Sequence, residues 1–495
     1  MRRCRSPETS AASLGHLGAL TLVMSTPNVH VITMTGNAST NEMISRLSLL
    51  LGEDKVRSGN GISEAYSHDE ALTATPQIPK AVIFVESTAD VIAVVRLADE
   101  LSVPITARGS GTGLSGGAIP HESGVVVSFE RMTNVLEIDK VNNVAVVEPG
   151  VTLGALDEVL AGHGLVYPVF PGELSGSIGG NVATNAGGMR AVKYGVTRHQ
   201  VLGLEFVLAT GEVIRSGGKY VKSSSGYDLT QLVIGSEGTL ALVTEVTVRV
   251  YPRPKYSKTM LVPFLHIEDI SSSIPAILAN GTTPLVLEYI DTLGLSAMST
   301  KVGLNLGVSP KIKESATAYL FIILEEMDLQ TLEAETTSLS QLLFSCGALE
   351  VYLLPEPSAA KLLEAREAAF WVSKEHGAND IVDVVIPRSE IPRYLNEAQR
   401  IAQTSATFIS GVGHVGDGNV HFSIYQPDPK LRDKVVMELL HLGLTLGGSI
   451  SAEHGIGSEK RKYLSQLEDP NKLELMRRIK QAFDPKGILN PEKVI

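Results

Sequence analysis

Apolar residues recur along the chain with spacings that separate strands from helices. A short apolar run predicts a buried strand at residues 81–85. It is followed by an amphipathic helix from Ser87 to Leu101 and a second strand at residues 103–107. This strand–helix–strand unit predicts a sheet that is at least partly parallel. Ahead of it, the spacing indicates a helix from Asn41 to Leu51.

The pattern stays rich in strands as far as two prolines, Pro252 and Pro254. A helix is expected from Thr152 to Gly162, between strand-like runs. The expected strands lie at residues 124–129, 135–139, 143–150, 203–214 and 240–250. Because proline interrupts regular structure, the pair marks the best interior boundary.

After the prolines, strand-like and helical segments alternate in a different way. Strands are expected at residues 258–264, 284–291, 318–326 and 406–413. Helices are expected at Ile267–Asn280, Asp328–Cys346, Ala359–Glu375, Ile391–Gln403 and Leu431–Leu446. This pattern favours an α+β domain in which helices pack on one face of an antiparallel sheet. We therefore expect a first domain at residues 41–254 and a second at residues 255–495.

Residues 1–40 stand apart from this pattern, and we expect them to be disordered or spurious. Arg2, Arg3 and Arg5, with several serines and almost no acid, are typical of a mitochondrial transit peptide. An over-extended start is an equal alternative. The true beginning would then be Met24, Met34 or Met43.

Composition excludes several classes of protein. The 495 residues carry 54 acidic and 42 basic side chains, a net charge of −12, and a single tryptophan, Trp371, which argues against nucleic-acid binding. Two cysteines, Cys4 and Cys346, are too few for a disulfide framework or an iron–sulfur cluster. The longest apolar run, near residues 17–24, is far shorter than the roughly 20 residues of a membrane-spanning helix. These features favour a soluble protein of a reducing compartment.

Two glycine-rich segments carry the first chemical signal. Residues 108–120 (RGSGTGLSGGAIP) hold five glycines, whose backbone amides can approach and surround a diphosphate. Gly111–Gly116 also match the G-x-G-x-x-G pattern of NAD-binding folds, but a strand follows where that motif opens a helix. A purely structural glycine turn is the other alternative. Residues 171–188 add a second such segment with short polar side chains, which suits a flat polar heterocycle. These side chains are Ser177, Asn181, Thr184 and Asn185.

A histidine pair in the second domain carries the next signal. Asp417-Gly418-Asn419 is typical of a turn, which would place His414 and His421 on neighbouring strands of a hairpin. His421 alternates with apolar neighbours and so shares the polar face. Two imidazoles and Glu453 are suitable ligands for a divalent metal. Taken alone, however, such a pair is more often structural.

Six segments together resemble the FAD-dependent 2-hydroxyacid dehydrogenases of the vanillyl-alcohol oxidase superfamily, in the branch of D-lactate dehydrogenase and the catalytic subunit of glycolate oxidase. The segments are residues 104–120, 175–205, 223–240, 413–422, 451–460 and 484–491. The resemblance implies an α+β fold: a two-lobed PCMH-type FAD-binding domain, followed by a cap domain with an antiparallel sheet that binds substrate.

The resemblance also implies which residues bind FAD. Because Thr112 stands where some superfamily members attach their flavin to a histidine, we expect non-covalent FAD. The expected cofactor-binding residues are Arg108, Gly109, Ser110, Gly111, Thr112, Gly113, Leu114, Ser115, Pro171, Gly172, Gly176, Ser177, Gly179, Gly180, Thr184, Asn185, Glu237, Gly238 and Asn490.

The same resemblance implies the chemistry of the second domain. His414, His421 and Glu453 match the ligands of a divalent metal, which we expect to be Zn or Mn. His454 matches the catalytic base, and Arg366 matches the arginine that binds the substrate carboxylate. Periodicity alone would make Arg366 an ordinary exposed helix residue. The α-hydrogen would pass to flavin N5, with electrons leaving to a quinone, a cytochrome or an iron–sulfur partner subunit.

Two departures from the resembling proteins bear on the substrate. Relatives that oxidise a dicarboxylate carry a lysine where this chain has Ile381, and an asparagine where it has Ser423. Both changes favour a small monocarboxylate, D-lactate or glycolate. The alternatives are a larger D-2-hydroxy acid, a redox-neutral transferase resembling alkylglycerone-phosphate synthase, and a non-enzymatic FAD-binding subunit. We expect a cytoplasmic protein, peripheral to the membrane at most and mitochondrial if eukaryotic, in a homodimer or hetero-oligomer.

Overall fold

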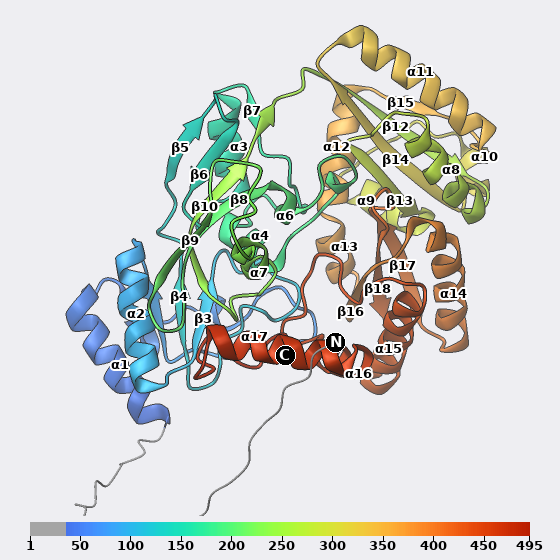
Figure 1. The fold of residues 1–495 in the computed structure, drawn as a ribbon. Coiled ribbons are helices and arrows are strands. Elements are labelled where there is room, and N and C mark those ends of the chain that lie inside the picture. The colour runs from blue at the N-terminus through green and yellow to red at the C-terminus, as the bar shows by residue number, and fades with distance from the viewer. Residues whose placement is uncertain (1–35) are drawn as a thin grey trace, which may run out of the picture. The chain divides into compact units, whose positions relative to one another are not determined.

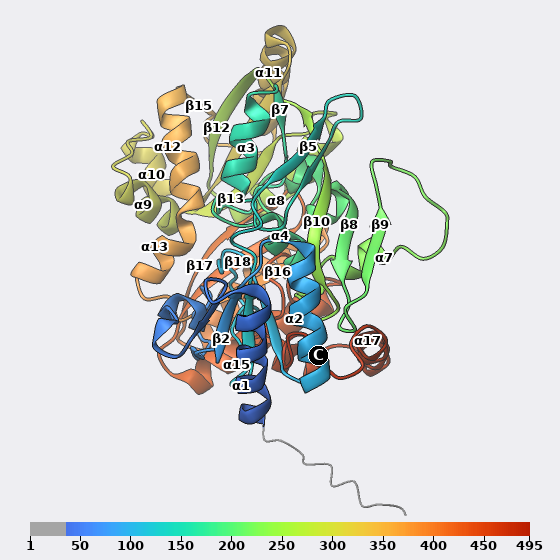
Figure 2. The same ribbon diagram turned by 90° about the vertical axis from the view of Figure 1, so that its left-hand side faces the viewer.

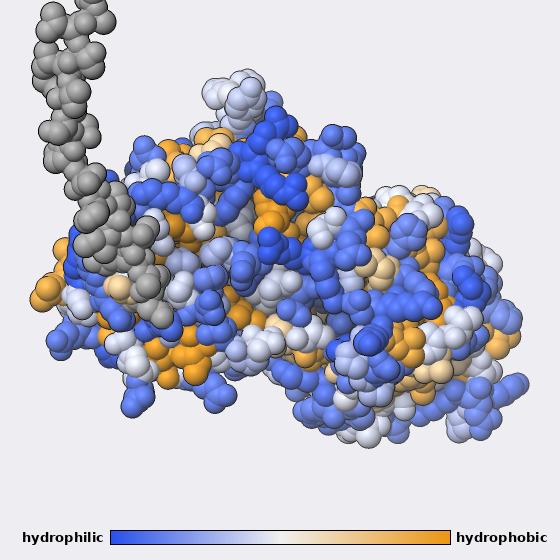
Figure 3. Space-filling view, turned by 90° about the horizontal axis from the view of Figure 1, so that it is seen from below, coloured by the Kyte–Doolittle hydropathy of each residue, from blue (hydrophilic) through white to orange (hydrophobic). Residues whose placement is uncertain are grey.

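The computed structural model describes residues 36–495 (Figure 1). The expectation for residues 1–40 therefore lies, up to residue 35, outside the described residues. The first helix, α1 (Gly36–Leu51), begins earlier than the expected Asn41. In the described part of the chain, no helix is long and apolar enough to cross a bilayer. Hydrophilic residues surround smaller apolar patches on the face seen in Figure 3.

A four-stranded sheet opens the N-terminal part, residues 36–252. Its order is β1 (Val56–Ser58), β2 (Ala81–Phe84), β4 (Val125–Ser128) and β3 (Ile105–Arg108). β2 and β3 both pair in parallel with β4, which confirms the partly parallel sheet. The connecting helix α2 (Thr88–Leu101) begins where the Ser87 hydroxyl accepts a hydrogen bond from the amide of Asp90.

A second lobe of the N-terminal part is built on an antiparallel sheet. Its order is β5 (Val135–Asp139), β6 (Val144–Val147), β10 (Leu242–Arg249), β8 (Val201–Val207) and β9 (Val213–Gly217). Three helices pack on it through Leu156, Val182 and Val233. They are α3 (Leu153–Ala161), α4 (Ile178–Thr184) and α7 (Leu229–Val233). The strand pair β7 (Leu165–Val166) and β11 (Tyr251–Pro252) lies beside the exit from this lobe.

The C-terminal part, residues 256–495, contains a seven-stranded antiparallel sheet. Its order is β15 (Tyr352–Leu354), β12 (Tyr256–Phe264), β14 (Ala318–Glu326), β13 (Val286–Asp291), β17 (Phe408–Gly413), β18 (Asn419–Tyr425) and β16 (Asp380–Val385). Four helices share a core with one face of the sheet. They are α8 (Ile267–Ala279), α11 (Leu329–Ser345), α14 (Ile391–Thr404) and α15 (Pro429–Thr445). The α+β fold class expected from the sequence is confirmed.

Helices also cover part of the opposite face of this sheet, which differs from the expected one-sided packing. Leu295 of α9 (Thr292–Lys301) and Leu362 of α12 (Glu356–Glu367) pack against Phe321 of β14. The β14 sequence AYLFIIL has apolar side chains on both faces, so both faces must be covered. A break at Ala368 separates α12 from α13 (Ala369–Glu375), where one helix was expected.

The last residues of the chain return to the N-terminal part. After α16 (Arg461–Leu467) and α17 (Pro470–Phe483), Leu489 forms a parallel bridge with Ile105 of β3. Figures 1 and 2 show α17 alongside the N-terminal lobes. The remaining short helices are α5 (Ala191–Tyr194), α6 (Thr197–Gln200), α10 (Pro310–Ser315), and three 3₁₀ turns at Gly59–Gly61, Glu64–Ser67 and Arg388–Glu390.

Candidate active site

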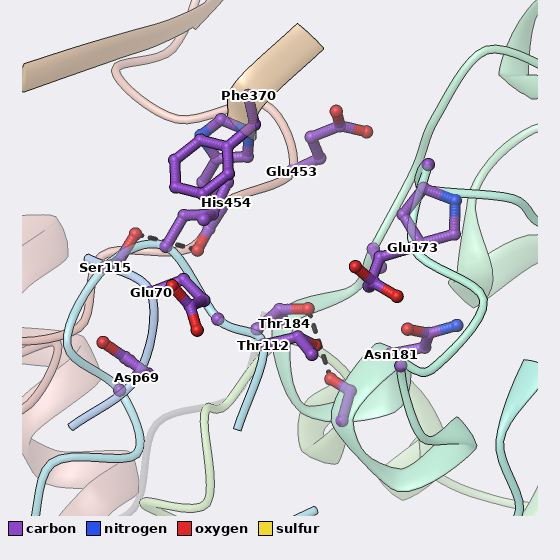
Figure 4. Close-up of a pocket in the computed structure, with 18 of the residues that line it drawn as sticks. Asp69, Glu70, Thr112, Ser115, Glu173, Asn181, Thr184, Phe370, Glu453 and His454 are labelled. Carbon is purple, nitrogen blue, oxygen red and sulfur yellow. Dashed lines mark hydrogen bonds between the residues drawn. The ribbon is translucent and has the colours of Figure 1, made fainter. Parts of the chain in front are cut away.

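A cavity of about 680 Å³ is lined by both parts of the chain. The two glycine-rich segments form its walls on the N-terminal side, and a hydrogen bond from Ser110 Oγ to the carbonyl of Ser175 joins them. β17, β18 and the segment around His454 line it from the C-terminal side. Figure 4 shows His454 on one side of the cavity and Asn181 on the other.

All but two of the residues that the sequence assigned to the site line this one cavity. They include Arg366, His414, His421, Glu453 and His454. From the expected FAD set, the lining residues are Arg108, Gly109, Ser110, Gly111, Thr112, Gly113, Leu114, Ser115, Pro171, Gly172, Gly176, Ser177, Gly179, Gly180, Thr184, Glu237 and Gly238. Segments more than 300 residues apart in the chain therefore meet at a single site.

Asn185 and Asn490 do not line the cavity, and each has another structural role. Asn185 ends α4 in the left-handed conformation, and its side-chain oxygen accepts a hydrogen bond from the Arg198 amide. Asn490 donates to the carbonyls of Gly117 and Glu237, at 2.9 and 2.8 Å. These two asparagines hold the walls in place from behind.

Of the two asparagines that the sequence places in the second glycine-rich segment, only Asn181 lines the cavity. It lies on α4, one turn before Asn185, and its buried side-chain nitrogen has no hydrogen-bond partner among the described residues. A buried donor without a partner is unfavourable unless a ligand satisfies it. The donor and the glycine walls therefore fit a polar, phosphate-bearing ligand such as FAD.

His414, His421 and Glu453 present their donor atoms to one another. His414 Nε2 lies 3.3 Å from Glu453 Oε1, and His421 Nε2 lies 3.5 Å from the same oxygen. The hairpin brings this about because Val412, two residues before His414, pairs with His421 across β17 and β18. Two imidazole nitrogens and one carboxylate oxygen, all within 4.8 Å of one another, fit a divalent metal ion.

A buried carboxylate stands behind each histidine, and the sequence reasoning missed both. Glu288 of β13 hydrogen-bonds Nδ1 of His414, and Asp383 of β16 lies 3.5 Å from Nδ1 of His421. Metal-binding histidines commonly hold their second nitrogen against a carboxylate in this way. The available signal was an acid within a strongly apolar strand sequence, VLEYID and IVDVV.

The electrostatics of the site are dominated by buried acids. Burial raises the pKa of Glu288, but Arg366 and His414 outweigh it and lower the pKa to about 2. Burial lowers the pKa of His414, yet Glu288 and Glu453 raise it to about 10. Burial lowers the pKa of His421 to about 3, so this imidazole is neutral. A cation between these ligands would take the place of the His414 proton.

His454 and Arg366 complete the polar lining. The ring of His454 stacks on that of His421 with centroids 5.1 Å apart, and burial lowers its pKa, which favours the neutral, proton-accepting form. Arg366 is only 8% exposed, unlike an ordinary surface helix residue. Its Nε donates to Glu288 Oε2 at 2.7 Å, and its buried Nη2 lies 2.7 Å from the same oxygen in an ion pair without an aligned hydrogen bond.

The face of the sheet beyond His421 is the wall available to a substrate side chain. Ile381 pairs with Ser423, which also pairs with Ser410, and all three line the cavity. Ser423 lies two residues after His421 on β18, so the two side chains share a face of the sheet and this row is adjacent to His421. The row carries no charged group.

Comparisons with known proteins agree with this geometry. Residues 79–217 match the family described as FAD binding domain, and residues 253–494 match the family described as FAD linked oxidases, C-terminal domain. By fold, the chain is similar to p-cresol methylhydroxylase (TM-score 0.78, 19% identity, covering 92% of this chain and 97% of that one). Alkyldihydroxyacetonephosphate synthase is also similar (TM-score 0.73, 18% identity, 91% and 86% covered).

Proteins related in sequence show the family more precisely than these structural neighbours do. An FAD-linked oxidoreductase of Mycobacterium tuberculosis is 49% identical, over 91% of this chain and 98% of the relative. D-lactate dehydrogenase of Archaeoglobus fulgidus is 38% identical (88% and 96% covered), and a glycolate oxidase subunit of Bacillus subtilis is 35% identical (92% and 97% covered). The chain therefore belongs to the FAD-linked oxidoreductase family that includes D-lactate dehydrogenases and glycolate oxidase subunits.

Proposed function

We propose that this protein oxidises a small 2-hydroxy monocarboxylate, such as D-lactate or glycolate, to the 2-oxo acid. The observation that carries the proposal is the convergence of Arg366, His454 and three metal-ligating side chains in one cavity with the glycine-rich walls. A 2-hydroxy acid has a carboxylate and a hydroxyl on adjacent carbons. The cavity offers a cation for the first and a neutral base for the second.

Each of these residues has a distinct role in the proposed reaction. Arg366, which lines the cavity, binds the substrate carboxylate through its guanidinium, while Nε and Nη2 stay paired with Glu288. His454, neutral because it is buried, accepts the proton of the hydroxyl. FAD, held without a covalent bond between the two glycine-rich walls, supplies the acceptor for the hydride equivalent from the α-carbon.

His414, His421 and Glu453 would hold a divalent cation, Zn²⁺ or Mn²⁺. Such a cation polarises a hydroxyl oxygen and lowers the pKa of its proton. Glu288 hydrogen-bonds Nδ1 of His414, and Asp383 lies 3.5 Å from Nδ1 of His421, so that Nε2 of each imidazole faces Glu453. The final electron acceptor would not be NAD. It would be a quinone, a cytochrome or an iron–sulfur partner subunit.

Ile381 and Ser423 support the choice of a monocarboxylate. They form the row of the sheet next to His421, where a second substrate carboxylate would find no cation. Leaving that carboxylate unpaired in a partly buried site is unfavourable. The wall therefore favours a substrate with a small uncharged side chain.

The decisive experiment is anaerobic mixing of the FAD-loaded protein with a panel of hydroxy acids. We expect D-lactate or glycolate to bleach the flavin absorbance near the visible maximum, and D-2-hydroxyglutarate to act far more slowly. His454→Asn should retain FAD and lose bleaching by at least about 100-fold. A flavin that stays oxidised with every hydroxy acid would instead favour a redox-neutral transferase or a non-enzymatic subunit.

A further inference from the structure

The segment that carries Glu453 and His454 is held by two buried carboxylates, one from each part of the chain. Oδ2 of Asp383 accepts hydrogen bonds from the amides of Ala452, Glu453 and His454, at 2.9 to 3.0 Å. Beyond Gly455, the next two amides donate to the carboxylate of Glu237 instead. Five amides of one short segment thus donate to two acids, one from each part of the chain.

Glu237 belongs to the N-terminal part, in the turn between α7 and β10. Its Oε1 accepts from the amide of Ile456 at 2.7 Å, and its Oε2 from the amide of Gly457 at 2.8 Å. The side chain is buried, and both carboxylate oxygens are used by the C-terminal part. Its backbone adopts φ +52°, a conformation that is unfavourable for a non-glycine residue and is kept only where the surroundings require it.

Two glycines make this close approach possible. An ideal Cβ at Gly455, where φ is +80°, would lie 2.9 Å from the Glu237 carboxylate. One at Gly457 would lie 1.9 Å from the carbonyl oxygen of Ser115, a residue of the first glycine-rich wall. Ser115 Oγ in turn donates to the carbonyls of His454 and Gly455. The segment is therefore fitted directly against the walls that line the cavity.

We propose that Glu237 is a positioning residue that fixes the Glu453–His454 segment relative to the FAD-binding walls. The inference rests on the proposed function, in which His454 must face a substrate held over the flavin. Asp383 alone would fix the segment within the C-terminal part. Glu237 was expected to bind FAD, but both of its carboxylate oxygens are used by Ile456 and Gly457, so it would set the distance between the two parts and act through His454.

A carboxylate suits this task better than any other side chain. The two amides point at different oxygens of Glu237, and a glutamine in the same place would present an NH₂ donor to one of them. Glu237→Gln keeps the size of the side chain and turns one contact into a clash of donors. Glu205 is a matched control, because it is a buried acid of the same part whose partners, Thr88, Thr244 and Arg215, lie outside the cavity lining.

Two measurements test the proposal on the FAD-loaded full-length protein. Hydrogen exchange resolved to single amides should be at least tenfold faster at Ile456 and Gly457 in Glu237→Gln, with Ala452 to His454 still protected. The rate of flavin reduction by the 2-hydroxy acid should fall at least tenfold at unchanged FAD content and near-constant substrate Kd. Glu205→Gln should change neither quantity at these positions.

Gly455→Ala offers an independent variant, because its new methyl group pushes the segment away from an intact Glu237. It should reproduce both effects even if Glu237→Gln folds poorly. Unchanged exchange at Ile456 and Gly457, a reduction rate within twofold of the parent, or selective loss of FAD from Glu237→Gln would each overturn the proposal. If no hydroxy acid reduces the parent protein, the proposed function fails, and the exchange pattern alone decides whether Glu237 holds the segment.

Discussion

Glu288 and Arg366 form a buried ion pair, in which Arg366 Nε donates to Glu288 Oε2 at 2.7 Å. The other oxygen of Glu288 faces Nδ1 of His414. One carboxylate therefore orients both the guanidinium proposed to bind substrate and a proposed metal ligand. The proposed substrate and metal sites would therefore be coupled through this one carboxylate.

Glu288→Gln should weaken both sites together. We expect metal affinity to fall about 10- to 100-fold and the KM for the hydroxy acid to rise, because a neutral amide with one acceptor oxygen cannot serve both His414 and Arg366. Metal titration of the metal-free protein and steady-state kinetics measure the two effects. Glu325→Gln is the control, since Glu325 lies in the same sheet but contacts Lys193 and Tyr194 instead. An unchanged metal affinity would contradict the coupling.

Removal of the metal should abolish turnover while the flavin stays bound. The proposed ligands are side chains of the C-terminal part, whereas the residues expected to hold the diphosphate are glycines of the N-terminal part, which stay in place without the metal. Dialysis against a chelator, followed by dye-linked assays and metal analysis, tests this, and Zn²⁺ or Mn²⁺ should restore activity. His421→Ala should bind substoichiometric metal, and the exposed His441→Ala should not. Full activity in the chelated protein would refute the metal assignment.

Ile381→Lys should shift the substrate preference towards dicarboxylates. A lysine opposite Ser423 would provide a charge-assisted partner for a second carboxylate. We expect the ratio of kcat/KM for D-2-hydroxyglutarate to that for D-lactate to rise at least tenfold. Ile381→Met, which alters shape without charge, should leave the ratio nearly unchanged. Equal ratios in the two variants would show that this row does not contact the substrate side chain.

Glu367, at the rim of the cavity, should make stability depend on pH. Burial raises its pKa to about 7, with Arg190 opposing the shift. Because the folded pKa lies above the usual glutamate pKa of 4.5, the parent loses stability as pH rises from about 4.5 to about 7. Glu367→Gln should therefore raise the melting temperature more at pH 8 than at pH 5. The exposed Glu364→Gln should show no such difference, and a pH-independent effect of Glu367→Gln would contradict the assignment.

Much of the fold could be predicted because local pattern and tertiary packing agree. The segment from β2 to β3 shows the clear apolar spacing of a buried strand, helix and strand, and Ser87 is a typical helix start. The two-sided covering of β14 was missed, because an apolar run does not reveal what packs on each face. The order β13-β17-β18-β16 joins strands far apart in sequence, and no local pattern contains that information.

The site was predictable where a motif supplied the residue, and not where only packing did. His421 was assigned to the polar face from the alternation of β18, and it lines the cavity. Asn185 was expected at the wall, but the helical turn of α4 directs Asn181 there instead. Glu288 and Asp383 belong to no sequence motif. Their positions near the two imidazoles depend only on which strands are neighbours in the sheet, and the local sequence does not contain that information.

The return of the chain to β3 has a consequence for how this protein can be divided. Ile488 and Leu489 belong to the same apolar core as β2, β3 and β4, although almost 400 residues separate them from β3. A gene fragment ending near Pro252 would leave that core open and the edge of β3 bare, a surface prone to aggregation. A recombinant first half should therefore carry residues 484–495 as an added segment, because these residues complete its core.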